Sequence, residues 1–223
     1  MQENMITLEA IKQNSVVDTL IRVGNENLGV MGFTEHGFRH LNLVSNISFN
    51  VLRLLELPSR DAELAAIAGY IHDIGNVVNR KGHHHSGAIL AYYILDDMKM
   101  PPDEIFTVIA AIGNHDEQTG QPVSSVAAAL ILADKSDVHR TRVRNRNYSG
   151  FDIHDRVNYA AERSFLRVDA ETKHIELELD IDSSISPVMD YFEIFLTRML
   201  MCRRAAGFLE CTFGLEINGK KLV

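Results

Sequence analysis

Apolar side chains recur at helical spacing through the first part of this chain, and histidines or aspartates stand where the apolar stripes begin or end. After His40, the apolar residues Val44, Ile47, Val51 and Leu54 follow at i+4, i+7, i+11 and i+14. This spacing places their side chains on one face of an α-helix. Residues 1–150 are therefore predicted to form helices separated by short loops.

Similar stripes predict the other helices of this region. One is expected to begin at Pro101-Pro102, because proline suits the first helical position and Asp103 and Glu104 suit the positive end of the helix dipole. A loop that contains Gly24 is expected after the first helix. The expected helices span residues 7–22, 40–57, 59–71, 83–94, 102–112 and 125–137.

The pattern changes after residue 150. Apolar and polar residues alternate at 173–181, which is the period of a half-buried β-strand. Strands are expected at residues 164–169, 173–181 and 212–217, with a helix at 187–206. We therefore predict a mainly α chain with a helical domain at residues 1–150, followed by a small ββαβ (α+β) C-terminal extension at residues 151–223.

The composition is that of an ordinary globular protein, with 46% hydrophobic and 23% charged residues among 223. The formal net charge of −8 argues against general binding to nucleic acids or to anionic membranes. No apolar run approaches the roughly 20 residues of a transmembrane helix, and no signal peptide is expected. The two cysteines, Cys202 and Cys211, suit a reducing compartment, so we expect a cytoplasmic protein.

Histidine is the unusual part of the composition, because seven of the ten histidines lie between His36 and His115. A buried imidazole or carboxylate is costly unless it finds partners. A single histidine on an apolar face is more often a core residue than a ligand, but an ordered set on successive helices would be satisfied by sharing cations. Such ligands suit Mn, Fe, Co, Ni or Zn better than Ca. The set consists of His40, His72, Asp73, His83, His115 and Asp134.

The order of these residues resembles the signature of the HD-domain superfamily of metal-dependent phosphohydrolases, over about residues 33–140. The central motif is Tyr70-Ile71-His72-Asp73-Ile74-Gly75, and the supporting segments are Phe38–Leu41, His83 with Gly87-Ala88, Asn114–Glu117 and Ala133–Asp137. The resemblance implies an all-α helical bundle. It also implies one metal held by His40, His72, Asp73 and Asp134, and a second held by His83 and His115, with Asp73 bridging the two.

The resemblance further implies the chemistry. A hydroxide that bridges two divalent transition metals would attack phosphorus, and the metals would offset the charge of the transition state. Lys135 is expected to assist at the phosphate, and Arg39 is a second choice for this role. Asp116, Glu117 or Asp137 would carry a proton or orient a metal ligand, and the sequence does not choose between them.

Three adjacent histidines compete for one ligand position. Neighbouring helical residues point about 100° apart, so at most one of His83, His84 and His85 faces the cluster. His83 is preferred for its spacing to the following Gly-Ala pair, and His84 is expected either to orient a metal ligand or to contact the substrate. Trinuclear relatives that hydrolyse cyclic di-GMP carry a glutamate where this chain has His36, so that activity is not expected.

Two further features allow alternative interpretations. The alternating arginines could bind phosphate, with Arg140 and Arg144 as substrate contacts, or could form a solvated segment paired with acidic side chains. No aromatic residues are interleaved with them, which argues against a groove for single-stranded nucleic acid. The apolar helix at 187–206 is predicted to be the core of the extension or a contact in a homodimer. The arginines of the run are Arg140, Arg142, Arg144 and Arg146.

The predicted function is hydrolysis of a phosphoester in a small phosphorylated substrate, either a nucleotide or another phosphometabolite. Two alternatives stay open. The same six ligands serve, in a minority of relatives, as a diiron oxygenase site, and dependence on iron and dioxygen would favour that activity. A nucleotide-binding sensor module would signal through the ββαβ unit, and ligand binding without turnover would favour it.

Overall fold

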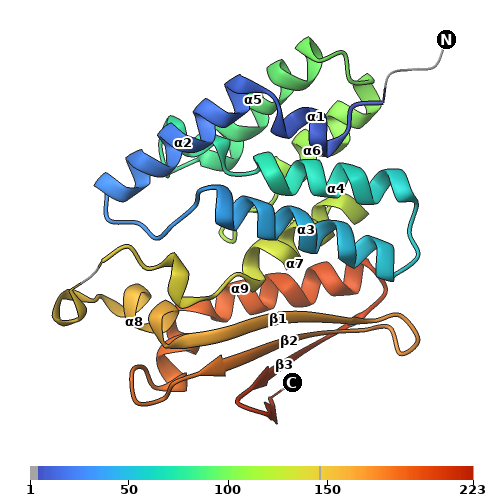
Figure 1. Cartoon of the computed structure of the whole chain (residues 1–223). Helices are drawn as coiled ribbons and strands as arrows, with labels where there is room; N and C mark the ends of the chain where they lie inside the picture. The colour runs from blue at the N-terminus through green and yellow to red at the C-terminus, as the bar shows by residue number, and fades with distance from the viewer. Residues whose placement is uncertain (1–4, 146, 223) are drawn as a thin grey trace.

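The structure is a computed structural model that describes residues 5–145 and 147–222, so Arg146 of the arginine run lies outside the described residues. Its first part is a bundle of helices, and a small sheet with one long helix follows (Figure 1). The helices of the bundle are α1 (Leu8–Lys12), α2 (Ser15–Val30), α3 (Phe38–Leu54), α4 (Ser59–Ile71), η1 (Ile74–Val77), α5 (His83–Asp97), α6 (Pro102–Gly113) and α7 (Ser125–Ser136). The connection to the sheet contains η2 (Arg140–Arg142), η3 (Tyr148–Gly150) and α8 (Ile153–Ala160).

The C-terminal part, as far as it is described, is a sheet in the order β1-β2-β3-β4 with one crossover helix. Strand β2 pairs antiparallel with β1 and parallel with β3, and the parallel pair requires the crossover that α9 provides. These elements are β1 (Ala161–Asp169), β2 (His174–Ile181), α9 (Val188–Phe208), β3 (Thr212–Ile217) and β4 (Lys220–Lys221). The predicted fold class, mainly α with a small α+β extension, is confirmed. Strand β4 adds to the prediction, because the chain turns at Asn218-Gly219 and pairs back onto β3.

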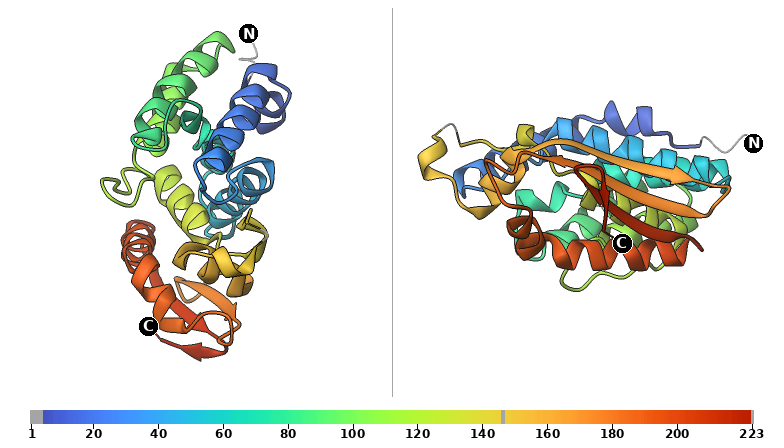
Figure 2. Two further views of the ribbon diagram at one scale, coloured as in Figure 1. Left: turned by 90° about the vertical axis from the view of Figure 1, so that its left-hand side faces the viewer. Right: turned by 90° about the horizontal axis from the view of Figure 1, so that it is seen from below.

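Helix α7 lies at the centre of the molecule. Its residues from Val126 to Ser136 are all buried, because α3, α4, α6 and α9 surround it. Helix α9 contacts both α7 and β3, so the bundle and the sheet share one hydrophobic core (Figures 1 and 2). The charged residues Asp134 and Lys135 are buried together with the rest of α7. The domain boundary at residues 150–151 stays a prediction.

The predicted helix at residues 7–22 is wrong in its bounds. The side chain of Asn14 accepts hydrogen bonds from two backbone N–H groups of the next turn, and this cap separates α1 from α2. Helix α2 then continues through Gly24, where a loop was expected. A Cβ on Gly24 would lie 3.1 Å from the backbone nitrogen of Val77, so the glycine allows α2 to pack closely against η1.

Gly75 lies where η1 meets α5, and it provides a test of this packing. A Cβ on residue 75 would lie 2.0 Å from the carbonyl oxygen of His83 and 2.5 Å from the backbone nitrogen of Gly87. Because both are backbone atoms, Gly75→Ala is expected to push η1 away from α5. The free energy of unfolding should fall by about 3 kcal/mol, as measured by urea denaturation.

The control for this experiment is Gly207→Ala in α9. A Cβ there meets no described heavy atom within 4 Å. This variant should therefore be neutral or more stable by up to about 1 kcal/mol, since alanine has the higher helix propensity. Equal unfolding midpoints for the two variants would contradict the close contact at Gly75.

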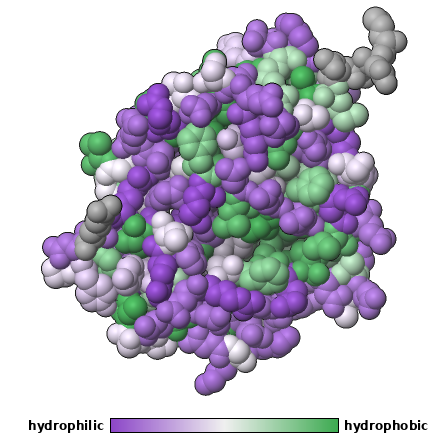
Figure 3. All heavy atoms as spheres, in the orientation of Figure 1, coloured by the Kyte–Doolittle hydropathy of each residue, from purple (hydrophilic) through white to green (hydrophobic). Residues whose placement is uncertain are grey.

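The surface gives little indication of a function by itself. On the face drawn in Figure 3, hydrophilic residues predominate, and apolar residues gather in the middle, between the helices and the sheet. Scattered exposed apolar residues are ordinary on folded domains. Among the described helices, none is both long enough and apolar enough to cross a bilayer.

Candidate metal centre

The structure brings the six predicted metal ligands together at the inner ends of the bundle helices. All six are buried, and subsets of them lie close enough to share one ion. They come from α3, from the residue pair directly after α4, from α5, from the loop after α6 and from α7. We call this set the ligand cluster, which consists of His40, His72, Asp73, His83, His115 and Asp134.

Asp73 is shared between two pairs of histidines. Its Oδ2 lies 3.4 Å from Nε2 of His72 and 3.8 Å from Nε2 of His40. Its Oδ1 lies 3.3 Å from Nε2 of His83 and 3.9 Å from Nε2 of His115. Each carboxylate oxygen therefore faces a different pair of imidazoles.

Asp134 joins the first of these pairs. Its Oδ1 lies 3.4 Å from Nε2 of His40 and 3.6 Å from Nε2 of His72. The first side of the cluster thus has two imidazoles and two carboxylates, and the second side has two imidazoles and the other oxygen of Asp73.

The outer nitrogen of every imidazole in the cluster is engaged. Nδ1 of His40 lies 2.7 Å from Oδ2 of Asp137, and Nδ1 of the other three lies 2.6–3.0 Å from a backbone carbonyl oxygen. Because these oxygens only accept hydrogen bonds, Nδ1 carries the proton in each ring. A neutral ring then presents the lone pair of Nε2 to the interior of the cluster, which is the arrangement of metal-binding histidines.

These inward lone pairs are not satisfied by the chain itself. Nε2 of His40 and Nε2 of His72 are buried and have no hydrogen-bond partner among the described residues. Nε2 of His83 and Nε2 of His115 lie 3.0 Å apart, although neither bears a proton when the rings are neutral. Two lone pairs at this distance require a proton or a cation between them, so the donor set fits bound divalent metals.

The charges of the cluster also favour a cation. Burial lowers the pKa of His83 to about 4 and holds the pKa of His115 well below its usual value. Burial would raise the pKa of Asp73 and of Asp134, but His72 beside the first and Lys135 beside the second hold both values well below the usual range. At neutral pH the rings of His83 and His115 are therefore neutral and both carboxylates are ionised, the forms that bind metals.

Asp137 supports the cluster from behind. Its carboxylate accepts hydrogen bonds from His40 and, in a two-bond contact of 2.6 and 3.2 Å, from the guanidinium of Arg39. Burial would raise its pKa, but Arg142, His40 and Arg39 lower it overall. Arg39 also pairs with Glu35. Arg39 is thus held against Asp137 and does not line the cavity described below, and its predicted role at the phosphate stays a prediction.

Lys135 lies between two carboxylates. Its Nζ is 2.6 Å from Oδ2 of Asp134 and 2.9 Å from Oε2 of Glu117. Burial would lower the pKa of Lys135, but these two carboxylates raise it overall, so the ammonium keeps its proton. Burial likewise opposes ionisation of Glu117, but Lys135 and Arg198 lower the Glu117 pKa to about 2.

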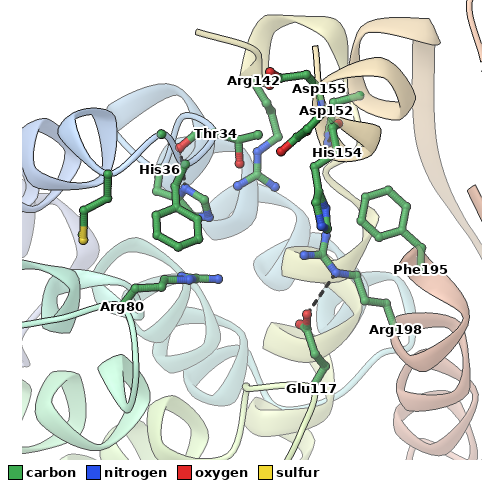
Figure 4. Close-up of a pocket in the computed structure, with 14 residues that line it drawn as sticks. Thr34, His36, Arg80, Glu117, Arg142, Asp152, His154, Asp155, Phe195 and Arg198 are labelled. Carbon is green, nitrogen blue, oxygen red and sulfur yellow. Dashed lines mark hydrogen bonds and ion pairs between the residues drawn. The ribbon is translucent and has the colours of Figure 1, made fainter. Parts of the chain in front are cut away.

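A cavity of about 340 Å³ opens beside the ligand cluster (Figure 4). Arg80, Arg142 and Arg198 point into it from three sides, and His36 and His154 also line it. His36 and the three arginines also line a smaller recess together with four members of the ligand cluster and Lys135, so the cavity and the cluster are connected through shared lining residues. The four members are Asp73, His83, His115 and Asp134.

The sequence reasoning missed several of these cavity residues. Arg198 lies in an apolar helix that was assigned to the core. The presence of an arginine in such a helix was the available signal that this position could have a functional role. Arg142 belongs to the predicted arginine run, but the run is not extended: it begins with the helical turn η2. Arg142 is therefore buried and donates to the carbonyl oxygens of Asp137 and Glu35.

The other predicted substrate contacts lie elsewhere. Arg140 pairs with Glu162 at 2.8 Å, and Arg144 donates to the carbonyl oxygens of Phe33 and Asn25. His84 lines a second, more open cavity with Asp116 and Thr119. The structure does not bring Arg140, Arg144 or His84 into the 340 Å³ cavity, and their contacts with a substrate stay predictions.

Comparisons with known proteins bear on this cluster. The sequence model of the HD domain family matches residues 35–138, a range that contains the whole ligand cluster. The chain is also 28% identical over 198 residues to an uncharacterized protein of Methanocaldococcus jannaschii, and the alignment covers 78% of this chain and 75% of that protein. HD domains bind divalent metals, which agrees with the donor set described above. Residues 35–138 of this chain are therefore a domain of the HD family.

Proposed function

We propose that this chain is a metal-dependent phosphohydrolase that hydrolyses a phosphoester of a nucleotide or another small phosphometabolite. The HD domain family includes metal-dependent phosphohydrolases. The observation that carries the proposal is the position of Asp73, whose two carboxylate oxygens face different pairs of imidazoles. A carboxylate placed in this way suits two cations, one on each oxygen.

The proposal assigns every member of the ligand cluster to one of two metals, and Asp73 to both. Two divalent transition metals (Fe, Mn, Ni, Co or Zn) would supply activation of water and neutralisation of phosphate oxygens. The donor set of nitrogen and carboxylate oxygen supports transition metals over calcium. The proposed ligands of the first metal are His40, His72, Asp73 and Asp134, and those of the second are His83, His115 and Asp73.

The surrounding side chains have separate roles in this proposal. Lys135 holds a positive charge beside the cluster, where it would bind a phosphate oxygen. Asp137 keeps the Nδ1 proton of His40 in place and so directs the Nε2 lone pair inward. With its pKa near 2, Glu117 stays ionised at neutral pH, so we assign it to the orientation of Lys135 rather than to proton donation.

The size and lining of the cavity support a small substrate. A volume of about 340 Å³ lies at the lower end of the range of small-molecule sites, which is roughly 300–1,000 Å³. Asp152, Asp155 and Asn158 of the α8 segment also line the cavity. These side chains suit hydroxyl or amino groups on the part of the substrate beyond the phosphate.

Metal removal tests the proposed function directly. The purified full chain should contain about two equivalents of transition metal, since the two oxygens of Asp73 face two different pairs of imidazoles. Dialysis against a chelator should abolish phosphate release from a panel of nucleotides and sugar phosphates, and adding back Mn²⁺, Fe²⁺, Co²⁺, Ni²⁺ or Zn²⁺ should restore it. Elemental analysis and a phosphate-release assay give the two readouts.

The same experiment separates the alternatives. If the chain holds two irons, consumes dioxygen and releases no phosphate, the proposed hydrolase activity is wrong and an oxygenase activity is supported instead. If the chain binds nucleotides but shows no turnover with any of these metals, the sensor module is supported. A chain that neither contains nor accepts metal would overturn the proposal. We also propose a cytoplasmic location, which is supported by the two cysteines, both free buried thiols.

A further inference from the structure

Arg198 reaches the ligand cluster from outside the HD domain. It belongs to α9, the crossover helix of the C-terminal sheet, and not to residues 35–138. Its side chain is 19% exposed and lines both the 340 Å³ cavity and the smaller recess that contains Asp73 and Asp134. Figure 4 shows its guanidinium directed into the cavity, above Glu117.

The charge of Arg198 is only partly balanced. Its Nε lies 3.4 Å from Oε1 of Glu117, while the other oxygen of that carboxylate bonds Lys135 at 2.9 Å. One carboxylate therefore serves two cations. Among the described residues, the two terminal nitrogens of Arg198 make no hydrogen bond, so the fork of the guanidinium is available to a ligand.

The guanidinium is also held in place. Its central carbon lies 4.4 Å from the ring centroid of Phe195, one turn earlier on α9. A cation over an aromatic face at this distance is attracted to the ring, and this contact restricts the side chain. Arg198 is thus oriented before any ligand binds, which reduces the entropy lost on binding.

Arg198 faces a second guanidinium across the cavity. Arg80, from the loop between η1 and α5, points toward the same space, and its Nη1 lies 3.6 Å from Oδ1 of Asp73 (Figure 4). Partly exposed cations that converge on one space favour an anion there, because an anion offsets their mutual repulsion. Guanidinium forks match the oxygens of a phosphate group in particular.

We propose that Arg198 binds the phosphoryl group of the substrate, so that the C-terminal extension supplies one side of the anion site of the HD domain. This inference rests on the proposed phosphohydrolase function for the nature of the anion. Arg198 contributes the fork that the ligand cluster lacks, and Phe195 is its positioning residue. Arg80 closes the anion site from the opposite side.

The test measures the binding of inorganic phosphate to the purified, metal-containing full chain by titration calorimetry. Arg198→Gln should raise the Kd for phosphate about tenfold to a hundredfold, because a charge-assisted contact is lost. Metal content should be unchanged, since Arg198 is not a proposed ligand. The matched control is Arg203→Gln, which removes an exposed arginine from the same helix and should leave the Kd unchanged.

A second variant covers the case in which Arg198→Gln does not fold, as judged by circular dichroism. Arg198→Lys keeps a positive charge beside Glu117 but lacks the fork, so its Kd should rise at least about threefold. Wild-type affinity for phosphate in Arg198→Lys and in any folded Arg198→Gln protein would overturn the inference.

The failure of this inference and the failure of the proposed function give different results. If wild-type protein hydrolyses phosphoesters and Arg198→Gln does so with unchanged KM and unchanged phosphate affinity, the function stands and the role of Arg198 is wrong. If no ester is hydrolysed but phosphate binding still depends on Arg198, the anion site stands and the hydrolase is wrong.

Discussion

Asp73→Asn is expected to remove both metals and to lower phosphate release by about a thousandfold or more, because this carboxylate faces both pairs of imidazoles. Asparagine has nearly the same shape, but it is uncharged and offers one oxygen in place of two. It therefore cannot give an anionic oxygen to each side of the cluster. The measurement is metal content per chain after reconstitution, together with phosphate release from an activated aryl phosphate.

The control for Asp73→Asn is Asp97→Asn, which makes the same chemical change at an exposed position at the end of α5. It should retain both metals and full activity. Retention of two metal equivalents in a folded Asp73→Asn protein would contradict the bridging role and would require each metal to be held by its own residues alone.

His115→Ala is expected to remove one metal equivalent and to leave the other. His115 belongs to the second side of the cluster, where its Nε2 lies 3.0 Å from Nε2 of His83. Without His115, that side retains only His83 and one oxygen of Asp73, which is too few ligands for a tight site. The first side keeps all its ligands. Phosphate release should fall by about a hundredfold or more, because a two-metal site stabilises both the attacking and the leaving oxygen.

His85→Ala is the matched control, because His85 is an exposed member of the histidine triplet on α5. Its metal content should equal that of wild type. Elemental analysis of the two variants side by side decides the matter. If the wild-type chain holds a single metal and His115→Ala holds it equally well, then His83 and His115 are not metal ligands and a mononuclear centre replaces the binuclear one.

The ligand cluster could be predicted from the sequence because the apolar stripe of a helix determines which of its residues lie near the core. A histidine at the end of an apolar stripe must lie near the core, and several such ends on successive helices meet in one place. The triplet shows the same constraint, because helical geometry directs His83 into the cluster, and His84 and the exposed His85 toward the second cavity. Whether each member binds a metal stays a prediction.

The wall of the cavity was not accessible in the same way. Arg198 approaches through a tertiary contact between α9 and α7, and no local pattern specifies which face of α9 meets α7. The alternating arginines did not predict the cavity wall, for a different reason. An alternating run predicts a common side only if the backbone is extended, and the turn η2 places Arg142 inside while Arg140 pairs with Glu162.

The bounds of α2 were missed because Gly24 has two common uses. Glycine ends many helices, but it also occurs where two backbones approach closely. Only the position of η1 beside α2 distinguishes these uses. Contacts of this kind join segments that are far apart in the chain, and a single sequence does not record them.

The crossover between β2 and β3 also sets the order in which a growing chain acquires the parts of its site. All members of the ligand cluster have been translated once the ribosome has passed Asp134, before α9 and β3 exist. Strand β2 must then wait for α9 to be synthesised before its parallel partner arrives. Arg198 therefore joins the cavity only after the ligand cluster has been translated, and the nascent chain offers its proposed metal ligands before it offers the arginine of the proposed anion site.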